Sequence, residues 1–260
     1  MSSTDNNNII LQSKPKRERT LSKRQAEYHN KHSRENSNGP ADGEEQDLCW
    51  IGPREEIPPI PRKFEYGDHT ADIILHGYGL SIEESFESMT YAMICYMFDH
   101  PERTTINPLL THTISITGNS IPDLVFRYLT EVLVQSINYH DDLSADVKAK
   151  LGKVGYPGMI PRLVRVLHFS EVKPTELLSA SESSKQGSTF KLEVEIQGNF
   201  IDTVKLGAGT EVKAITNELT RLETLTDEEE IRNKGGKFHI QVLVDICYTD
   251  SAESDTHGAS

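Results

Sequence analysis

Two helix-start signals, placed among segments that read as strands, limit the folds that this chain can adopt. Ser81 and Glu84 form a Ser-x-x-Glu capping box, and apolar residues then recur at spacings of three and four over residues 82–96. Ser120 opens a second such segment, in which apolar pairs recur every four residues over 124–133. Each pattern predicts an amphipathic helix that buries one face against a core.

The segments that read as strands do not alternate regularly with these helices, as the strands of a parallel α/β sheet would. Phe190–Ile196 alternates apolar with polar residues, which is typical of a strand with one side facing solvent. Phe64–Tyr78 has the pattern of two strands joined by a turn. Two helices among about six or seven strands predict an α+β fold, a single domain with a mixed or antiparallel sheet packed on two main helices. The further predicted strands are Thr111–Thr117, Leu163–Phe169, Glu211–Leu225 and Phe238–Tyr248.

The chain is predicted to have three parts. Residues 1–61 are rich in Ser, Asn, Glu and Pro and predict a disordered arm. Residues 62–248 form the predicted domain, and residues 249–260 form a polar C-terminal tail. Within the domain, residues 141–161 read as a polar loop or insertion, and residues 174–188 read as a serine-rich, low-complexity insertion between strands.

The predicted arm carries a basic stretch, Lys14–Arg24, with six basic residues and one acidic residue, Glu18. This composition is compatible with a nuclear-import signal or with an arm that touches RNA. A solvated run of charge explains it more simply, and that is the interpretation we favour.

The acidic balance of the chain narrows the choice of partners. Lys and Arg number 27 against 40 Asp and Glu, and the net charge of −13 falls almost entirely on residues 62–260. An acidic surface disfavours unaided, non-specific binding to nucleic-acid backbones, whereas it suits a basic protein partner or bound cations.

Neither a membrane span nor a disulfide framework is predicted. No run approaches about 18 consecutive apolar residues, and the N-terminal segment lacks the apolar core of a signal peptide. The cysteines, Cys49, Cys95 and Cys247, are odd in number and too widely spaced for a zinc pattern. We therefore expect a soluble, intracellular protein without membrane contact.

The sequence has no Gly-x-Ser-x-Gly elbow, no His-Glu-x-x-His, no phosphate-binding P-loop and no Cys-x-x-Cys. One place that could carry chemistry is Asp68-His69-Thr70-Ala71-Asp72, which directly precedes an apolar segment. Its two carboxylates could converge on a cation, with His69 beside them. A capped turn, in which Asp68 and Thr70 bond backbone amides, explains the same spacing and is favoured on spacing alone.

The second place is Asp245, which stands between two apolar residues in a strongly apolar segment. A buried, ionised carboxylate needs a partner, because unpaired burial costs several kcal/mol. If the strand has a solvent-facing side, His239 and Gln241 share it with Asp245 and no partner is needed. Lys213 is the cationic candidate near such carboxylates. The residues alone indicate an acidic α+β domain that could hold a cation through oxygen ligands.

Taken together, these segments resemble the archease family. The motifs that carry the resemblance are Phe64–Asp72 (FEYGDHTAD), Gly77-Tyr78-Gly79, Tyr96–Asp99, Gly209–Thr216 (GTEVKAIT) and Val242–Ile246 (VLVDI). They are separate, occur in the family's order and cover about residues 62–246, so the resemblance is specific. It implies a small α+β protein that is not an enzyme and serves as cofactor to the RtcB-type tRNA-splicing RNA ligase. There it promotes guanylylation of the ligase, and thereby multiple turnover in joining tRNA exon halves.

The resemblance also implies which residues act. The family's divalent-cation site matches Asp72, Asp245 and Ile246, and oxygen ligands favour calcium, with magnesium as the alternative. The positions expected to act in activating the partner are Lys213, Asp68 and His69. The implied partner is the ligase with its complex, through which RNA and GTP would be contacted indirectly. The implied location is the nucleus, the cytoplasm or both.

The chain departs from the family pattern at several places, and residues 141–161 and 174–188 are longer than the compact family pattern needs. It continues through residues 247–260, where family chains typically stop, so that Ile246 could offer a cation only its backbone carbonyl. Lys205-Leu206 stands where the family often has a basic residue followed by histidine, and Asn217 replaces a common aromatic residue.

Two further functions stay open. One is that of a chaperone or specificity modulator for a tRNA-modifying enzyme such as a methyltransferase. The other is that of an independent metal-dependent hydrolase that uses Asp68, Asp72 and His69.

Overall fold

We describe the fold from a computed structural model, which defines residues 57–70, 72–151, 158–172, 189–200 and 209–247. The expected disorder of the N-terminal arm up to residue 56, the serine-rich insertion at 174–188, the pair Lys205-Leu206 and the tail at 249–260 lie outside these residues.

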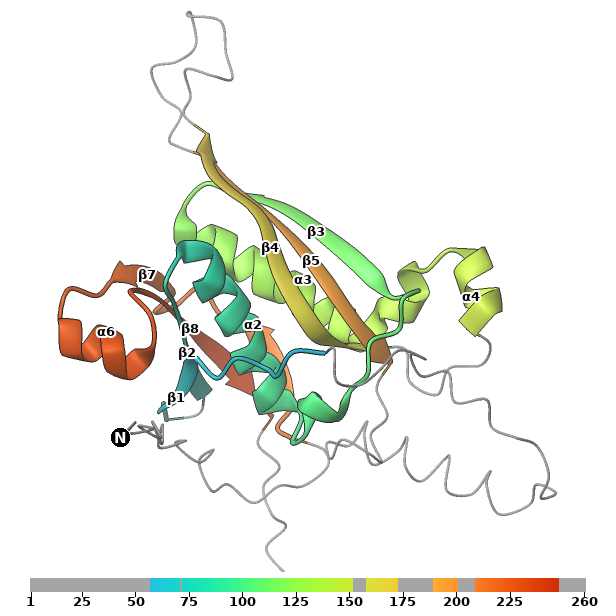
Figure 1. Cartoon of the computed structure of the whole chain (residues 1–260), viewed down its shortest axis with the longest axis horizontal. Helices are drawn as coiled ribbons and strands as arrows, with labels where there is room; N and C mark the ends of the chain where they lie inside the picture. The colour runs from blue at the N-terminus through green and yellow to red at the C-terminus, as the bar shows by residue number, and fades with distance from the viewer. Residues whose placement is uncertain (1–56, 71, 152–157, 173–188, 201–208, 248–260) are drawn as a thin grey trace, which may run out of the picture.

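The strands form two antiparallel sheets (Figure 1). The larger sheet has the order β1-β2-β8, and β6 and β7 both pair with the free side of β8. Its strands are β1 (Phe64–Asp68), β2 (Asp72–Gly79), β6 (Val212–Ile215), β7 (Arg221–Thr224) and β8 (Phe238–Ile246). The smaller sheet has the order β3-β5-β4, with β3 (Thr111–Gly118), β4 (Met159–Val172) and β5 (Thr189–Phe200).

Two long helices lie between the sheets (Figure 1). Helix α2 (Ile82–Met97) contacts β1, β2 and β8 of the larger sheet and β4 of the smaller one. Helix α3 (Ile121–Asp142) contacts all three strands of the smaller sheet as well as β6 and β7. The short elements are the 3₁₀ helix η2 (Pro101–Arg103) and the helices α4 (Ala145–Leu151) and α6 (Glu228–Lys234).

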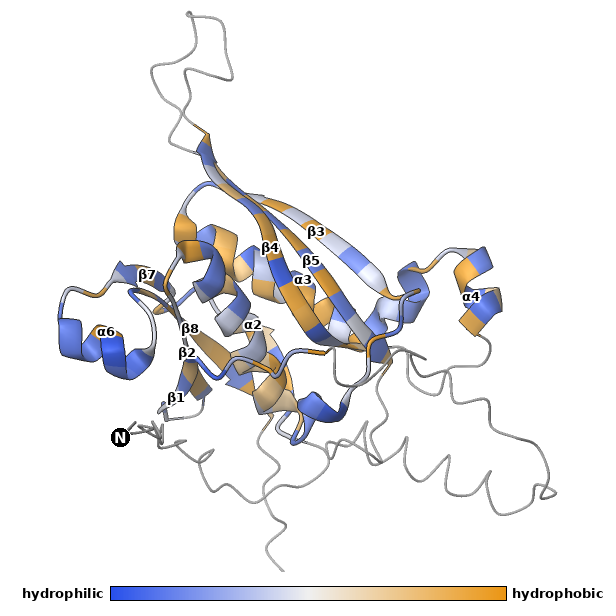
Figure 2. Ribbon diagram, viewed as in Figure 1, coloured by the Kyte–Doolittle hydropathy of each residue, from blue (hydrophilic) through white to orange (hydrophobic). Residues whose placement is uncertain are grey.

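The core lies where α2 and α3 meet the two sheets. Every α2 residue from Ser88 to Met97 is buried, because the helix has a sheet on either side. Phe86 and Tyr128 pack edge to face in this core, and the Tyr128 hydroxyl bonds the Thr90 hydroxyl at 2.5 Å. Figure 2 shows the contrast with α6, which is almost entirely hydrophilic and buries none of its residues.

The connections from β2 to α2 and from β3 to α3 have the same structure. Each strand ends in glycine, and a serine two residues later caps the helix: Ser81 accepts from the Glu84 amide at 3.2 Å, and Ser120 accepts from the Asp123 amide at 3.3 Å. At Gly79 an added Cβ would lie 2.4 Å from a main-chain nitrogen of the helix's first turn, and at Gly118 the distance would be 2.7 Å. Both helices therefore start in direct contact with the preceding strand.

The structure confirms the predicted α+β class, both helix starts and the strands at Phe64–Tyr78, Thr111–Thr117 and Phe190–Ile196. Two expectations are wrong. Residues 141–161 are not one loop, because α4 forms within them, with Ser144 accepting from the Val147 amide at 3.4 Å, and β4 begins at Met159. Glu211–Leu225 is not one strand, because β6 and β7 are separated along β8. Within the residues that the structure describes, no helix is long and apolar enough to cross a membrane.

Candidate functional site

Two carboxylates predicted from distant parts of the sequence lie side by side. Asp72 begins β2, Asp245 lies near the end of β8, and the two residues are directly opposite in the antiparallel register. Residues opposite each other in such a pair project to the same face, with Cβ atoms about 4.5–5.5 Å apart. The side chain of Asp72 is 21% exposed and that of Asp245 is 44% exposed, so both carboxylates remain accessible at the edge of the sheet.

A basic side chain approaches each carboxylate. His69 Nδ1 lies 3.4 Å from Asp72 Oδ2, and Lys213 Nζ lies 3.6 Å from Asp245 Oδ1. Lys213 falls within a register irregularity of β6, between the residues that pair with Ile246 and Asp245. Such an irregularity changes the direction in which a side chain points, which explains why the Lys213 side chain reaches Asp245 on the neighbouring strand. The structure thus brings together four of the six residues that the sequence singled out.

The remaining two lie differently. Asp68 is the exposed last residue of β1 and directly precedes His69. Ile246 has a buried side chain on the opposite face from Asp245, and the chain continues to Cys247, whose amide donates to the Glu211 carbonyl at 3.0 Å. Ile246 can therefore reach a cation only through its own main-chain carbonyl.

The donor set at this edge fits a hard cation in part. Carboxylate and carbonyl oxygens suit calcium or magnesium, but calcium takes about six to eight oxygen ligands. Among the described residues, no group of three or more His, Cys, Asp and Glu side chains is arranged to hold a metal ion. Water or a partner protein would have to supply the ligands beyond Asp72, Asp245 and the Ile246 carbonyl.

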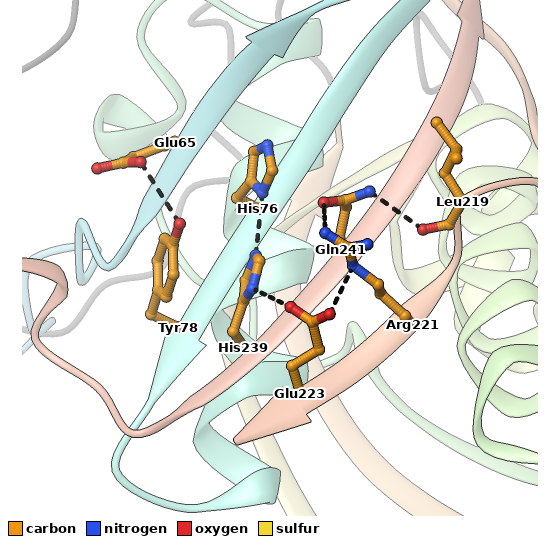
Figure 3. A network of polar contacts seen from close by, with 8 residues as sticks. All are labelled: Glu65, His76, Tyr78, Leu219, Arg221, Glu223, His239 and Gln241. Carbon is orange, nitrogen blue, oxygen red and sulfur yellow. Dashed lines mark hydrogen bonds and ion pairs between the residues drawn. The ribbon is translucent and has the colours of Figure 1, made fainter. Parts of the chain in front are cut away.

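A second polar cluster lies on the same face of the sheet (Figure 3). The cluster, here called the His–Glu network, consists of Glu65, His76, Tyr78, Arg221, Glu223, His239 and Gln241. Sequence reasoning placed only two of these residues, His239 and Gln241, on one face with Asp245, and the register confirms that placement. That face is not simply solvated, however, because the two residues are only 7% and 6% exposed.

The contacts within the His–Glu network define its proton arrangement. His239 Nδ1 lies 3.5 Å from Glu223 Oε2, so we assign the proton of this ring to Nδ1. His239 Nε2 is then an acceptor, and His76 Nδ1 donates to it at 2.9 Å. Burial, and then the neighbouring His239, lower the pKa of His76 to about 4, and burial likewise lowers the pKa of His239. Both rings are therefore neutral at neutral pH.

This arrangement predicts a loss of stability in mild acid. His76 takes up a proton near pH 6.5 in the unfolded chain but only near pH 4 in the folded one, so the unfolded state binds more protons in this window. The free energy of unfolding should therefore fall as the pH drops from about 6.5 to about 4. Urea unfolding at about pH 7 and about pH 5 should show a smaller fall for His76→Gln than for the intact chain. Equal falls in the two proteins would contradict the assignment.

Comparison with known proteins gives consistent similarities. Residues 64–145 match the model of the Archease protein family. "Protein archease" of Danio rerio is 30% identical over 176 residues, which cover 68% of this chain and 86% of the relative. "Protein archease-like" of Caenorhabditis briggsae is 38% identical over 187 residues, which cover 71% of this chain and 90% of the relative. The solution structure of Methanobacterium thermoautotrophicum protein 1598 superposes with a TM-score of 0.44 at 19% identity, covering 71% of this chain and 99% of that one.

Proposed function

This chain belongs to the archease family, and we propose that it activates an RtcB-type tRNA-splicing RNA ligase by promoting guanylylation of that ligase. The ligase performs the covalent chemistry, and the present chain is its non-catalytic partner. The observation that carries the proposal is the direct pairing of Asp72 with Asp245, with Lys213 3.6 Å from the second carboxylate.

The carboxylates serve as cation ligands in this proposal. Asp72, Asp245 and the Ile246 carbonyl would hold a divalent cation, calcium or magnesium, which supplies positive charge for phosphate oxygens when it is bound. Lys213 holds Asp245 in place through its ion pair, and His69, whose Nδ1 lies 3.4 Å from Asp72 Oδ2, orients Asp72. Because the site lies at an accessible sheet edge, a partner can complete it.

The charge of the chain supports a protein partner with a basic surface. The net charge is −13, and complementary charge speeds encounter and selects the binding orientation. A ligase that binds GTP and RNA needs cationic residues around its own site, and the negative charge of this chain is complementary to them. RNA and GTP are contacted through the ligase in this scheme.

The direct test is the joining of tRNA halves by a purified RtcB-type ligase with GTP, under single-turnover and multiple-turnover conditions. The intact chain should increase the multiple-turnover rate and the fraction of guanylylated ligase, while leaving joining by pre-guanylylated ligase unchanged. A ligase that is competent in a single turnover but unaffected by the chain would contradict the proposal. Capture of a tRNA methyltransferase in place of the ligase would support the modulator function instead.

A further inference from the structure

The edge of the larger sheet is interrupted beside the candidate site. Strand β6 ends at Ile215, which is opposite Val244, and β7 begins at Arg221, which is opposite Gln241. The five residues Thr216–Thr220, here called the edge loop, therefore span only two positions of β8. An excursion of this kind breaks the ladder of an edge strand and directs side chains away from the sheet.

Leu219, within the edge loop, has an unfavourable backbone conformation. Its φ of 57° makes it the single non-glycine residue with positive φ among those the structure describes. Leucine is disfavoured there because its Cβ lies too close to the following carbonyl oxygen, whereas glycine and asparagine are tolerated. The residue is nonetheless 50% exposed, so packing into the core does not explain its conformation.

Hydrogen bonds hold the edge loop in this shape. The Thr216 amide and hydroxyl both donate to the Leu243 carbonyl, at 3.1 and 2.9 Å, and the Thr220 hydroxyl donates to the Thr216 carbonyl at 3.1 Å. The side-chain nitrogen of Gln241, Nε2, donates to the Leu219 carbonyl at 3.2 Å (Figure 3). Arg221 donates in turn to Gln241 Oε1 at 3.1 Å, so the His–Glu network supports the strained residue. The loop is thus ordered around an exposed leucine.

The edge loop lies within reach of any protein that binds the carboxylate pair. Thr216 bonds to Leu243, two residues before Asp245, and Leu219 bonds to Gln241, four residues before it. At about 3.4 Å per residue these positions lie about 7 and 14 Å from Asp245 along the strand. A specific interface covers about 800 Å² on each partner, a patch roughly 30 Å across, and so would include both.

We propose that the edge loop is a docking element and that Leu219 inserts into an apolar recess on the RNA ligase, a proposal that rests on the proposed function. The recess would be bordered by cationic groups, because exposed Glu218 precedes Leu219 and Asp245 lies on the adjacent strand. Among the described residues, the other exposed large apolar side chains belong to other elements, namely the β2–α2 turn, the segment before β3, α3 and β4; they are Leu80, Leu109, Val134 and Leu167. Strain at Leu219 is retained because the exposed side chain serves binding.

The test uses Leu219→Asn in the full chain, with Leu80→Asn as the matched control. Asparagine tolerates the left-handed conformation but removes the apolar contact, so the variant should melt about 2–4 °C higher than the intact chain. Its affinity for the purified ligase, measured by titration calorimetry, should fall roughly tenfold. Leu80→Asn should leave the affinity unchanged. A more stable protein that binds more weakly cannot be explained by misfolding.

The outcomes separate this inference from the proposed function. Unchanged affinity of Leu219→Asn, together with normal stimulation of the ligase, would overturn the docking role of Leu219 and leave activation intact. An equal loss of affinity in Leu80→Asn would also overturn it, because the effect would not be specific to the edge loop. An intact chain that does not bind the ligase would overturn the proposed function and the docking role with it.

Discussion

Replacing Asp72 and Asp245 together by asparagine is expected to lower multiple-turnover joining of tRNA halves to the rate of the ligase alone. Asparagine keeps the size of the side chain and one oxygen but removes the negative charge, so neither a hard cation nor cationic groups of the partner are held. Each single substitution should reduce the stimulation about tenfold or more, equivalent to about 1.4 kcal/mol. Guanylylated ligase, followed over time, is the direct measurement.

Stability separates loss of function from loss of fold in this experiment. Like charges directly opposite each other on a sheet are destabilising, so the double variant should be as stable as the intact chain, or more so. Glu193→Gln, on β5 of the other sheet, removes a carboxylate of similar exposure and serves as the control. Stimulation by the double variant at the level of the intact chain would exclude the carboxylate pair from the mechanism.

The elements that were predictable from the sequence are those specified by local signals. Ser81 and Ser120 both sit at helix starts because a side-chain cap acts within one turn, and the apolar spacing that follows identifies the buried face. Helix α6 has equally clear local signals, with Asp227 accepting from the Glu230 amide at 2.8 Å and Gly235 at φ 71° as its C-cap. It was missed because none of its residues is buried, so no apolar period marks it.

The geometry of the candidate site depends on contacts between distant segments. From spacing alone, Asp72 belonged to a turn and Asp245 to an apolar strand, and only the β2–β8 register places them opposite each other. The position of Lys213 depends further on a local irregularity in the pairing of β6 with β8. A one-residue slip in either register would send these side chains to the other face. The family resemblance assigned these residues to one site, whereas their positions in the sequence alone did not.

For the His–Glu network, the sequence indicates which residues share a face but not that this face is buried. His76 and Tyr78 follow Asp72 at a period of two or its multiples, so their shared face could have been read from the sequence. Their burial could not, because it depends on β7 and α6, which supply Arg221, Glu223 and Lys234 over that face. A solvent-facing side was one of the two alternatives that the sequence left open for the strand that contains Asp245, and it does not hold at His239 and Gln241, which are buried together with Tyr78.

Gly79→Ala is expected to be among the most destabilising single-methyl additions in the chain. The added Cβ would lie 2.4 Å from the Ser85 nitrogen and 2.7 Å from the Ser81 carbonyl oxygen, both main-chain atoms at the start of α2. The helix would have to move away from β2, and overpacking of this kind costs about 1–3 kcal/mol. Since about 2–4 °C of melting temperature corresponds to 1 kcal/mol for a chain of this size, the fall should be easily measured by thermal unfolding.

The matched control tests whether main-chain contact is the cause. At Gly67 an added Cβ would also come close to another atom, 2.9 Å from His76 Nε2, but that atom is the end of a side chain. The ring can shift by a few tenths of an ångström while its other nitrogen, Nδ1, keeps the hydrogen bond to His239. Gly67→Ala should therefore cost less than about 1 kcal/mol, since alanine is otherwise the better strand residue. Gly118→Ala should behave like Gly79→Ala, because its Cβ would lie 2.7 Å from the Leu124 nitrogen at the start of α3. Equal losses at Gly67 and Gly79 would mean that strand conformation, and not the close approach of each helix to the preceding strand, requires these glycines.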